Sequence, residues 1–317
     1  MANREKDGTV RTAQETHSDH AAKSRGPAGQ DAEPGESAKL DELRTRLHGM
    51  WATVAGSWGD HADYVDTRAA ALADRMLDLA APQPGERVLE LACGPGGLGL
   101  AAAKRVLPDG EVVLSDVVAE MTAIASERAA SLGLTNVSAR ELDLEQIDQP
   151  DDAFDVVLCR EGLMLVPDPA RAAREIRRVL RPGGRFALAV WGPRDENPWL
   201  GVLLDSVSEQ LGAPVPPPGI PGPFSLDDRD RLAGLLSEAG LAEVVLHDQP
   251  VPARAVTFDE WWSRSTALAG PLSQVLAALP ADAIEAIRVR AQGAMAAYET
   301  ADGLEIPGLS LIASGRA

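Results

Sequence analysis

The stretch Val88–Gly97 reads Val-Leu-Glu-Leu-Ala-Cys-Gly-Pro-Gly-Gly and decides the fold class of the chain around it. Its first residues are apolar apart from one acid, Glu90, and predict a buried strand. Glycines follow at positions 94, 96, 97 and 99, and the Ala- and Leu-rich segment Leu98–Val106 has good helix propensity. A strand, a glycine-rich turn and a helix in this order are typical of nucleotide-binding α/β proteins.

This turn is compatible with two kinds of ligand. The spacing Gly94-x-Gly96-x-x-Gly99 matches the dinucleotide fingerprint, and Asp116 follows at the expected distance. However, a carboxylate at Glu90 would repel a pyrophosphate and attract a ligand that carries an amino group and a sulfonium. An NAD(P)-dependent oxidoreductase therefore stays the alternative, weakened further because the chain has no Tyr-x-x-x-Lys pair.

The segment Glu90–Gly96 resembles the first motif of class I S-adenosylmethionine (SAM)-dependent methyltransferases, an acid followed by alternating glycines. Ala92 stands where that family has its first glycine. The small-molecule branch, similar to the ubiquinone/menaquinone methyltransferases, is the nearest match, and the likeness extends from about Trp51 to the C-terminus. The resemblance implies SAM as methyl donor. It also implies a Rossmann-like, doubly wound sheet of seven mostly parallel strands with an antiparallel last strand.

Acids follow three successive predicted strands, and we expect them at one edge of the sheet. Asp116 ends the predicted strand Glu111–Ser115, where a carboxylate can accept hydrogen bonds from both ribose hydroxyls of an adenosine. The resemblance implies that Asp143 lies near the exocyclic amine of the adenine. The full set of cofactor-binding residues that we expect is Glu90, Ala92, Cys93, Gly94, Gly96, Asp116, Val117, Met121, Asp143, Leu144 and Arg160.

Methyl transfer from SAM is an in-line displacement, so an enzyme mainly positions donor and acceptor. A general base can also remove a proton from the acceptor, and the candidates are Glu161 and His61. No metal is expected, because Arg160 would repel a cation at this strand end and no other cluster has ligand spacing. A non-catalytic SAM-binding protein on the same fold is the third alternative.

The acceptor is expected under two cover segments. Trp51 and Trp58 are seven residues apart, which predicts one shared helical face before the first strand. Residues 192–231 interrupt the alternation of strands and helices and contain a proline-rich loop, which we interpret as a lid over the substrate. A surface arm or a homodimer contact is the alternative interpretation of this insertion. The expected lining residues are Trp58, Trp191, Asn197 and Trp199, with Phe224 as a further candidate.

Composition limits the partners of the chain. The 317 residues carry a formal net charge of −18, which argues against nucleic acid and anionic membranes as partners and favours a small-molecule substrate. The two cysteines, Cys93 and Cys159, fit a reducing cytosol, and no apolar run is long enough to span a bilayer. Residues 1–38 are polar and predict a disordered tail, whereas 39–317 predict one domain.

Overall fold

The computed structural model describes residues 34–317, which form a seven-stranded sheet with the order β3-β2-β1-β4-β5-β10-β6. Strand β10 is antiparallel to both of its neighbours, and the other strands run parallel to one another. The predicted doubly wound sheet with an antiparallel last strand is thereby confirmed. The strands span Arg87–Leu91 (β1), Glu111–Asp116 (β2), Val137–Glu141 (β3), Phe154–Arg160 (β4), Leu180–Trp191 (β5), Ala242–Pro250 (β6) and Leu309–Arg316 (β10).

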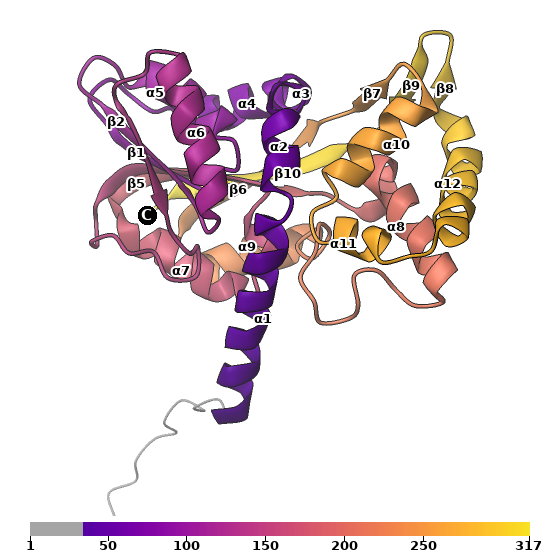
Figure 1. Ribbon diagram of the computed structural model, residues 1–317. Coiled ribbons are helices and arrows are strands. Elements are labelled where there is room, and N and C mark those ends of the chain that lie inside the picture. The colour runs from indigo at the N-terminus through magenta and orange to yellow at the C-terminus, as the bar shows by residue number, and fades with distance from the viewer. Residues whose placement is uncertain (1–33) are drawn as a thin grey trace, which may run out of the picture.

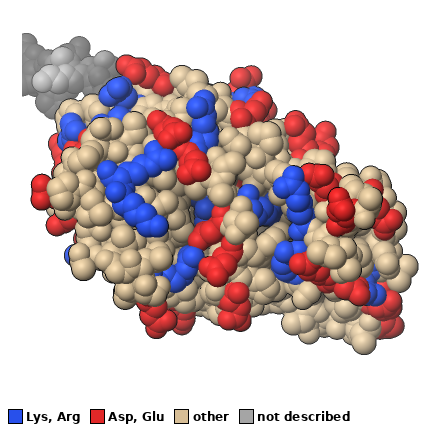
Figure 2. Space-filling model, turned by 90° about the horizontal axis from the view of Figure 1, so that it is seen from above, with Lys and Arg blue, Asp and Glu red and all other residues tan. Residues whose placement is uncertain are grey.

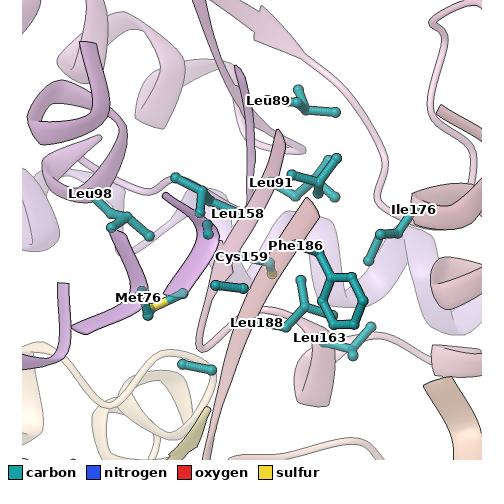
Figure 3. Packing of buried hydrophobic residues seen from close by; sticks show 14 of the residues in the cluster. Met76, Leu89, Leu91, Leu98, Leu158, Cys159, Leu163, Ile176, Phe186 and Leu188 are labelled. Atoms are coloured by element: carbon teal, nitrogen blue, oxygen red, sulfur yellow. The ribbon is translucent and has the colours of Figure 1, made fainter. Parts of the chain in front are cut away.

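Helices cover both faces of this sheet, with α4, α5 and α6 on one side and α7 and α9 on the other (Figure 1). The central strands are buried on both faces, and Val156 to Cys159 of β4 have no exposed surface. Apolar side chains from the strands and from the flanking helices pack into one core (Figure 3). These helices span Ala70–Ala80 (α4), Gly97–Arg105 (α5), Ala119–Ser131 (α6), Pro169–Val179 (α7) and Arg229–Glu238 (α9).

A second, smaller core lies beside the main sheet (Figure 1). It combines helices α8 (Pro198–Leu211), α10 (Phe258–Ala267), α11 (Leu272–Ala277) and α12 (Ala281–Met295) with a three-stranded sheet of order β7-β9-β8. The three strands span Ala253–Ala255 (β7), Glu299–Thr300 (β8) and Gly303–Ile306 (β9). We call this unit the cap.

The predicted lid insertion, residues 192–231, is only one part of the cap. The other part is the chain between β6 and β10, which packs on α8 and was not predicted to join it. The two parts pack together because α8 alone cannot bury its own apolar side chains. Residues 229–231, at the end of the predicted insertion, instead begin α9 of the main body.

The N-terminal part of the described chain consists of three helices, α1 (Pro34–Ala52), α2 (Ala55–Asp60) and α3 (Ala62–Arg68). Helix α1 begins at Pro34, so the last five residues of the predicted disordered tail, 34–38, are helical. The rest of that prediction, residues 1–33, lies outside the described residues. The predicted shared helical face of Trp51 and Trp58 is also wrong. The chain breaks between α1 and α2, and the two rings meet edge to face with centroids 6.1 Å apart.

The segment Arg181–Gly184, which carries a Pro-Gly-Gly sequence, is part of β5. The helix ends at Val179, and Leu180 already pairs with Phe154 of β4. The next pair is Val156 with Arg185, so the Pro-Gly-Gly segment forms a bulge within the strand.

Acidic and basic side chains are interspersed over the face seen from above, without a continuous basic surface on it (Figure 2). Within residues 34–317, no helix has both the length and the apolar character needed to cross a membrane.

Candidate active site

A pocket opens at the ends of β1, β2 and β4, where parallel strands of an α/β sheet commonly bind ligands. Helix α1 forms its cover and contacts α6 of the main body, and Thr53, the residue after α1, accepts a hydrogen bond from Gln274 of helix α11 in the cap. The pocket is lined by Leu47, His48, Trp51, Trp58, Val65, Ala92, Cys93, Gly94, Pro95, Asp116, Val117, Met121, Leu142, Asp143, Leu144, Glu145, Arg160, Glu161, Gly162, Leu165, Val166 and Pro167.

The glycine turn after β1 is held from the neighbouring strand. The backbone N–H of Gly94 donates to Asp116 Oδ2 at 2.9 Å, and Asp116 Oδ1 accepts from Val118 at 3.1 Å. Burial raises the pKa of the Asp116 carboxyl, and these backbone donors oppose that rise. Ala92 opens the turn with φ +49°, a left-handed conformation that costs a residue with a Cβ free energy. The strain lies at the wall of the pocket, where the backbone must bend sharply.

Glu90, one of the expected cofactor-binding residues, is buried behind the turn and lies outside the lining of the pocket. Its Oε2 accepts a hydrogen bond of 2.8 Å from the backbone N–H of Gly99 in the first turn of α5. Burial raises the pKa of this carboxyl to about 8. Glu90 therefore fastens α5 to β1. Gly96 is also outside the lining, because it faces Ala125 of α6.

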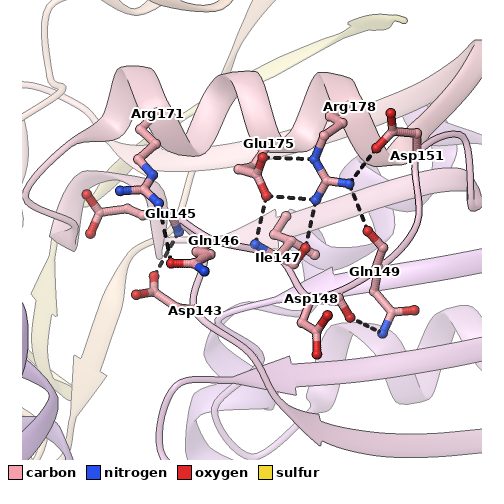
Figure 4. Close-up of polar contacts among 10 residues, drawn as sticks. All are labelled: Asp143, Glu145, Gln146, Ile147, Asp148, Gln149, Asp151, Arg171, Glu175 and Arg178. Carbon is pink, nitrogen blue, oxygen red and sulfur yellow. Dashed lines mark hydrogen bonds and ion pairs between the residues drawn. The ribbon is translucent and has the colours of Figure 1, made fainter.

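The loop after β3 supplies Asp143 and Leu144 to the pocket and is fastened to α7 (Figure 4). Glu175 of α7 accepts from the backbone of Ile147, and Arg178 donates to the carbonyls of Ile147 and Gln149. These contacts hold the part of the loop that follows the two lining residues.

The same loop ties down α1. Arg44 of α1 makes two hydrogen bonds of 2.9 Å to the carboxylate of Glu145, whose side chain is 1% exposed. Glu145 also accepts from the backbone of Asp168. Since Leu47, His48 and Trp51 follow Arg44 on α1, this ion pair sets where the cover meets the pocket.

Two charged residues end β4 inside the pocket. The guanidinium of Arg160 lies 3.5 Å from the carboxylate of Asp66 in α3. Glu161 has φ +62°, a second left-handed residue with a Cβ at this site, and Ser310 of β10 donates to its Oε1 at 3.0 Å. Burial raises the pKa of the Glu161 carboxyl, and Arg160, Arg68 and the Ser310 hydrogen bond oppose the rise.

Sequence comparison identifies relatives of the chain. A family model described as a methyltransferase domain matches residues 82–208. An uncharacterized protein of Mycobacterium tuberculosis is 31% identical over 218 residues, which cover 67% of this chain and 75% of the relative. The ubiquinone/menaquinone biosynthesis C-methyltransferase UbiE of Hydrogenovibrio crunogenus is 35% identical over 149 residues, covering 46% and 59% of the two chains.

The chain belongs to the class I SAM-dependent methyltransferases. Its methyl donor is S-adenosylmethionine. The solved structure of the YcgJ protein from Bacillus subtilis shares the fold, with a TM-score of 0.52 and 24% identity over 77% of this chain and 97% of that one.

Three of the predicted lining residues of this methyltransferase pack in its interior, outside the lining of the pocket. Asn197 is fully buried, and its amide donates to the carbonyls of Gly192, Pro193 and Leu309 while its oxygen accepts from Trp199 and from the backbone of Leu309. Trp191 and Trp199 pack on each other with centroids 4.9 Å apart, outside the pocket lining. Phe224 also packs between the two cores, so of these predictions only Trp58 meets the pocket.

His61 is not placed to act as a base in this methyltransferase. It lies between α2 and α3, its Nδ1 contacts the carbonyl of Ser57 at 2.8 Å, and it is outside the pocket lining. Conversely, His48 and Glu145 line the pocket and Asp66 contacts the pocket residue Arg160, but none of the three was predicted as a site residue. Each is a single polar residue in an ordinary helix or loop, and no motif marks it in the sequence. Within residues 34–317, no group of three or more His, Cys, Asp or Glu is arranged to hold a metal ion.

Proposed function

We propose that the enzyme transfers the methyl group to a small-molecule acceptor by in-line displacement, with Glu161 taking the acceptor's proton. The observation that carries this proposal is the position of Glu161. It is a pocket carboxylate at the end of β4, held by Ser310 and by a left-handed backbone. Strained residues that the surrounding structure holds in place cluster at functional sites.

The donor half of the pocket suits an adenosyl amino acid. Asp116 would hold the ribose, with Val117 and Met121 beside the adenine and Asp143 and Leu144 at the far edge of the ring. The backbone of Ala92, Cys93 and Gly94 would face the amino-acid end. No heavy atom lies within 4 Å of where a Cβ on Gly94 would stand, so a ligand has room to approach this turn. Bound SAM supplies an electrophilic methyl group on its sulfonium.

Glu161 has the electrostatic setting of a general base. Burial raises its pKa above that of a free glutamate, which makes the carboxylate a stronger base. Arg160 and Arg68 favour the ionised carboxylate and oppose that rise. The Ser310 hydroxyl orients one oxygen and leaves the other available to the acceptor.

The cover favours a small acceptor. Helices α1, α2 and α3 contribute Trp51, Trp58 and Val65 to the pocket, and α1 is fixed to the loop after β3 through the buried Glu145. A macromolecular acceptor would have to displace these helices. A compact, largely apolar molecule fits the aromatic lining without such a rearrangement.

Calorimetric titration of the purified protein with S-adenosylhomocysteine and, in parallel, with NADH tests the cofactor assignment of the pocket. We expect micromolar binding of the first and none of the second. The reverse result would overturn the proposal. Acceptor screening follows, with release of S-adenosylhomocysteine as the readout and the Glu161→Gln variant as the check on the base.

A further inference from the structure

We propose that Arg68 is the anion-binding residue of the acceptor site, and that the acceptor carries a carboxylate. This inference rests on the proposed function and names the chemical class of its substrate. Arg68 is the last residue of α3, one helical turn after the pocket residue Val65. It lies close enough to Glu161 for each side chain to shift the pKa of the other.

Arg68 lacks the partners that a buried guanidinium needs. Within residues 34–317 it forms no ion pair, and its hydrogen bond to the carbonyl of Val251 is long, at 3.3 Å. Its Nε is fully buried and has no acceptor. Burial lowers its pKa, which means that the cation is held there at a cost in free energy. Buried charges in proteins are normally paired, so the missing anion points to a ligand.

The surroundings fix the guanidinium in place while leaving it without a carboxylate. Arg68 stacks on the ring of Trp199 with its Cζ 3.8 Å from the centroid, and Trp191 lies 5.1 Å away. Stacking holds the guanidinium plane but uses none of its N–H donors. Among the described residues Nη1 donates no hydrogen bond and Nη2 donates only the long one to Val251, so these two terminal nitrogens are the donors proposed to bind a carboxylate.

A second arginine strengthens the positive character of this region. Arg264 of α10 lies over the ring of Tyr64, 4.1 Å from the centroid, and lowers the pKa of Arg68 by charge repulsion. Arg264 is paired with Glu260, yet its Nε is also buried without an acceptor. Two cationic side chains, one from the N-terminal cover and one from the cap, therefore lie close enough to repel each other, next to the pocket residue Glu161 but outside the lining of the pocket itself.

Glu161 does not cancel this charge. It forms no ion pair with Arg68 among the described residues, and Arg160 and Ser310 also act on it. The arrangement separates two tasks: Arg68 would hold the carboxylate of the acceptor, and Glu161 would receive the proton from its methyl-accepting atom. Arg68 acts here as a residue that sets specificity, by binding a part of the acceptor that does not react.

A matched pair of aromatic fragments tests the proposal. Binding of para-trifluoromethylbenzoate and of its neutral amide is measured by fluorine NMR on the enzyme saturated with S-adenosylhomocysteine. In the wild type we expect the acid to bind about tenfold more tightly than the amide or better, as a charge-assisted bidentate contact allows. Arg68→Gln should abolish the preference, and Arg68→Lys should keep part of it.

The control variant is Arg254→Gln, which removes an arginine of β7 that is exposed and paired with Glu305. It should leave the preference unchanged. Melting temperatures add a second readout: Arg68→Gln should melt at or above the wild-type temperature, because it removes an uncompensated charge, whereas a purely structural arginine would lower it on removal.

Two results would overturn the inference. One is equal or undetectable binding of acid and amide to the wild type while S-adenosylhomocysteine binds normally. The other is an acid preference that survives Arg68→Gln. Neither affects the proposed methyl transfer, whose own failure would show as absent binding of S-adenosylhomocysteine in the calorimetric titration.

Discussion

The carboxylate of Asp66 lies directly against Gly97, the first residue of α5, with no room for a Cβ between them. Asp66 is held there by Arg128 of α6 at 2.6 Å and by Arg160 of β4 at 3.5 Å. The start of this helix is where a dinucleotide-binding protein places a pyrophosphate. Here the chain's own carboxylate is at that place, where it would repel a pyrophosphate.

The first prediction concerns this contact. Gly97→Ala forces a methyl group into the Asp66 carboxylate, and we expect it to lower the free energy of unfolding by about 1–3 kcal/mol, as overpacking does. Gly293→Ala is the matched control, because nothing lies within 4 Å of its added Cβ inside α12, and it should stabilise by about 0.5–1 kcal/mol. Urea unfolding measures both. A Gly97→Ala variant as stable as the wild type would contradict the close approach.

The second prediction concerns the proposed base. Glu161→Gln keeps the shape of the side chain but cannot accept a proton, so we expect kcat to fall about 100-fold to 10,000-fold. Affinity for S-adenosylhomocysteine should stay the same. The base acts when it is ionised, and its pKa is raised, so the wild-type rate should increase with pH at values above the ordinary pKa of a glutamate. The variant should lack this pH-dependent increase. Glu141→Gln, an exposed control at the end of β3, should leave the profile unchanged.

The third prediction concerns stability and pH. Glu90 has a folded-state pKa of about 8 against an ordinary value of 4.5, so its protonated form favours the folded state. That contribution is complete below about pH 4.5 and is lost as the pH rises toward 8. Glu90→Gln imitates the neutral form and can still accept from Gly99. Its melting temperature relative to wild type should therefore increase steadily from pH 5 to pH 8.

A flat difference between the two proteins across this range would contradict the raised pKa of Glu90. Glu111→Gln serves as the control, since that side chain is 71% exposed. Its melting curve should follow that of the wild type at each pH.

The fourth prediction concerns the cover helix. Arg44→Gln leaves the buried Glu145 without its ionic partner, and we expect a loss of about 3–5 kcal/mol in the free energy that holds α1 in place. Hydrogen exchange of α1 amides should accelerate, and S-adenosylhomocysteine should dissociate faster because α1 lines the pocket. Asp41→Asn changes only the exposed partner of Arg44 and should have little effect. Unchanged exchange in Arg44→Gln would show that other contacts fix α1.

Local sequence was sufficient for individual strands of the main sheet and for several residues that line the pocket at their carboxyl ends. Apolar segments such as β4 and the glycine turn after Glu90 form through interactions between near neighbours, whereas the seven-stranded, mostly parallel sheet was expected from the family resemblance. Asp116, Asp143 and Arg160 could be placed at the pocket because the ends of adjacent parallel strands necessarily meet.

Tertiary structure alone decided where the remaining side chains point. Glu90 occupies the predicted strand end, yet its carboxylate turns toward Gly99, because a buried oxygen takes the nearest free helix N–H. Asn197 was expected to line the substrate site, but its side chain binds the backbone carbonyls of Gly192 and Leu309. Asp66 lies against Arg160, which is about a hundred residues further along the chain. The sequence by itself determined the fold class of this methyltransferase and the strand ends that form one edge of its pocket. Only packing between distant segments determined the helices that cover the pocket, the cap and the partners of the buried charged residues.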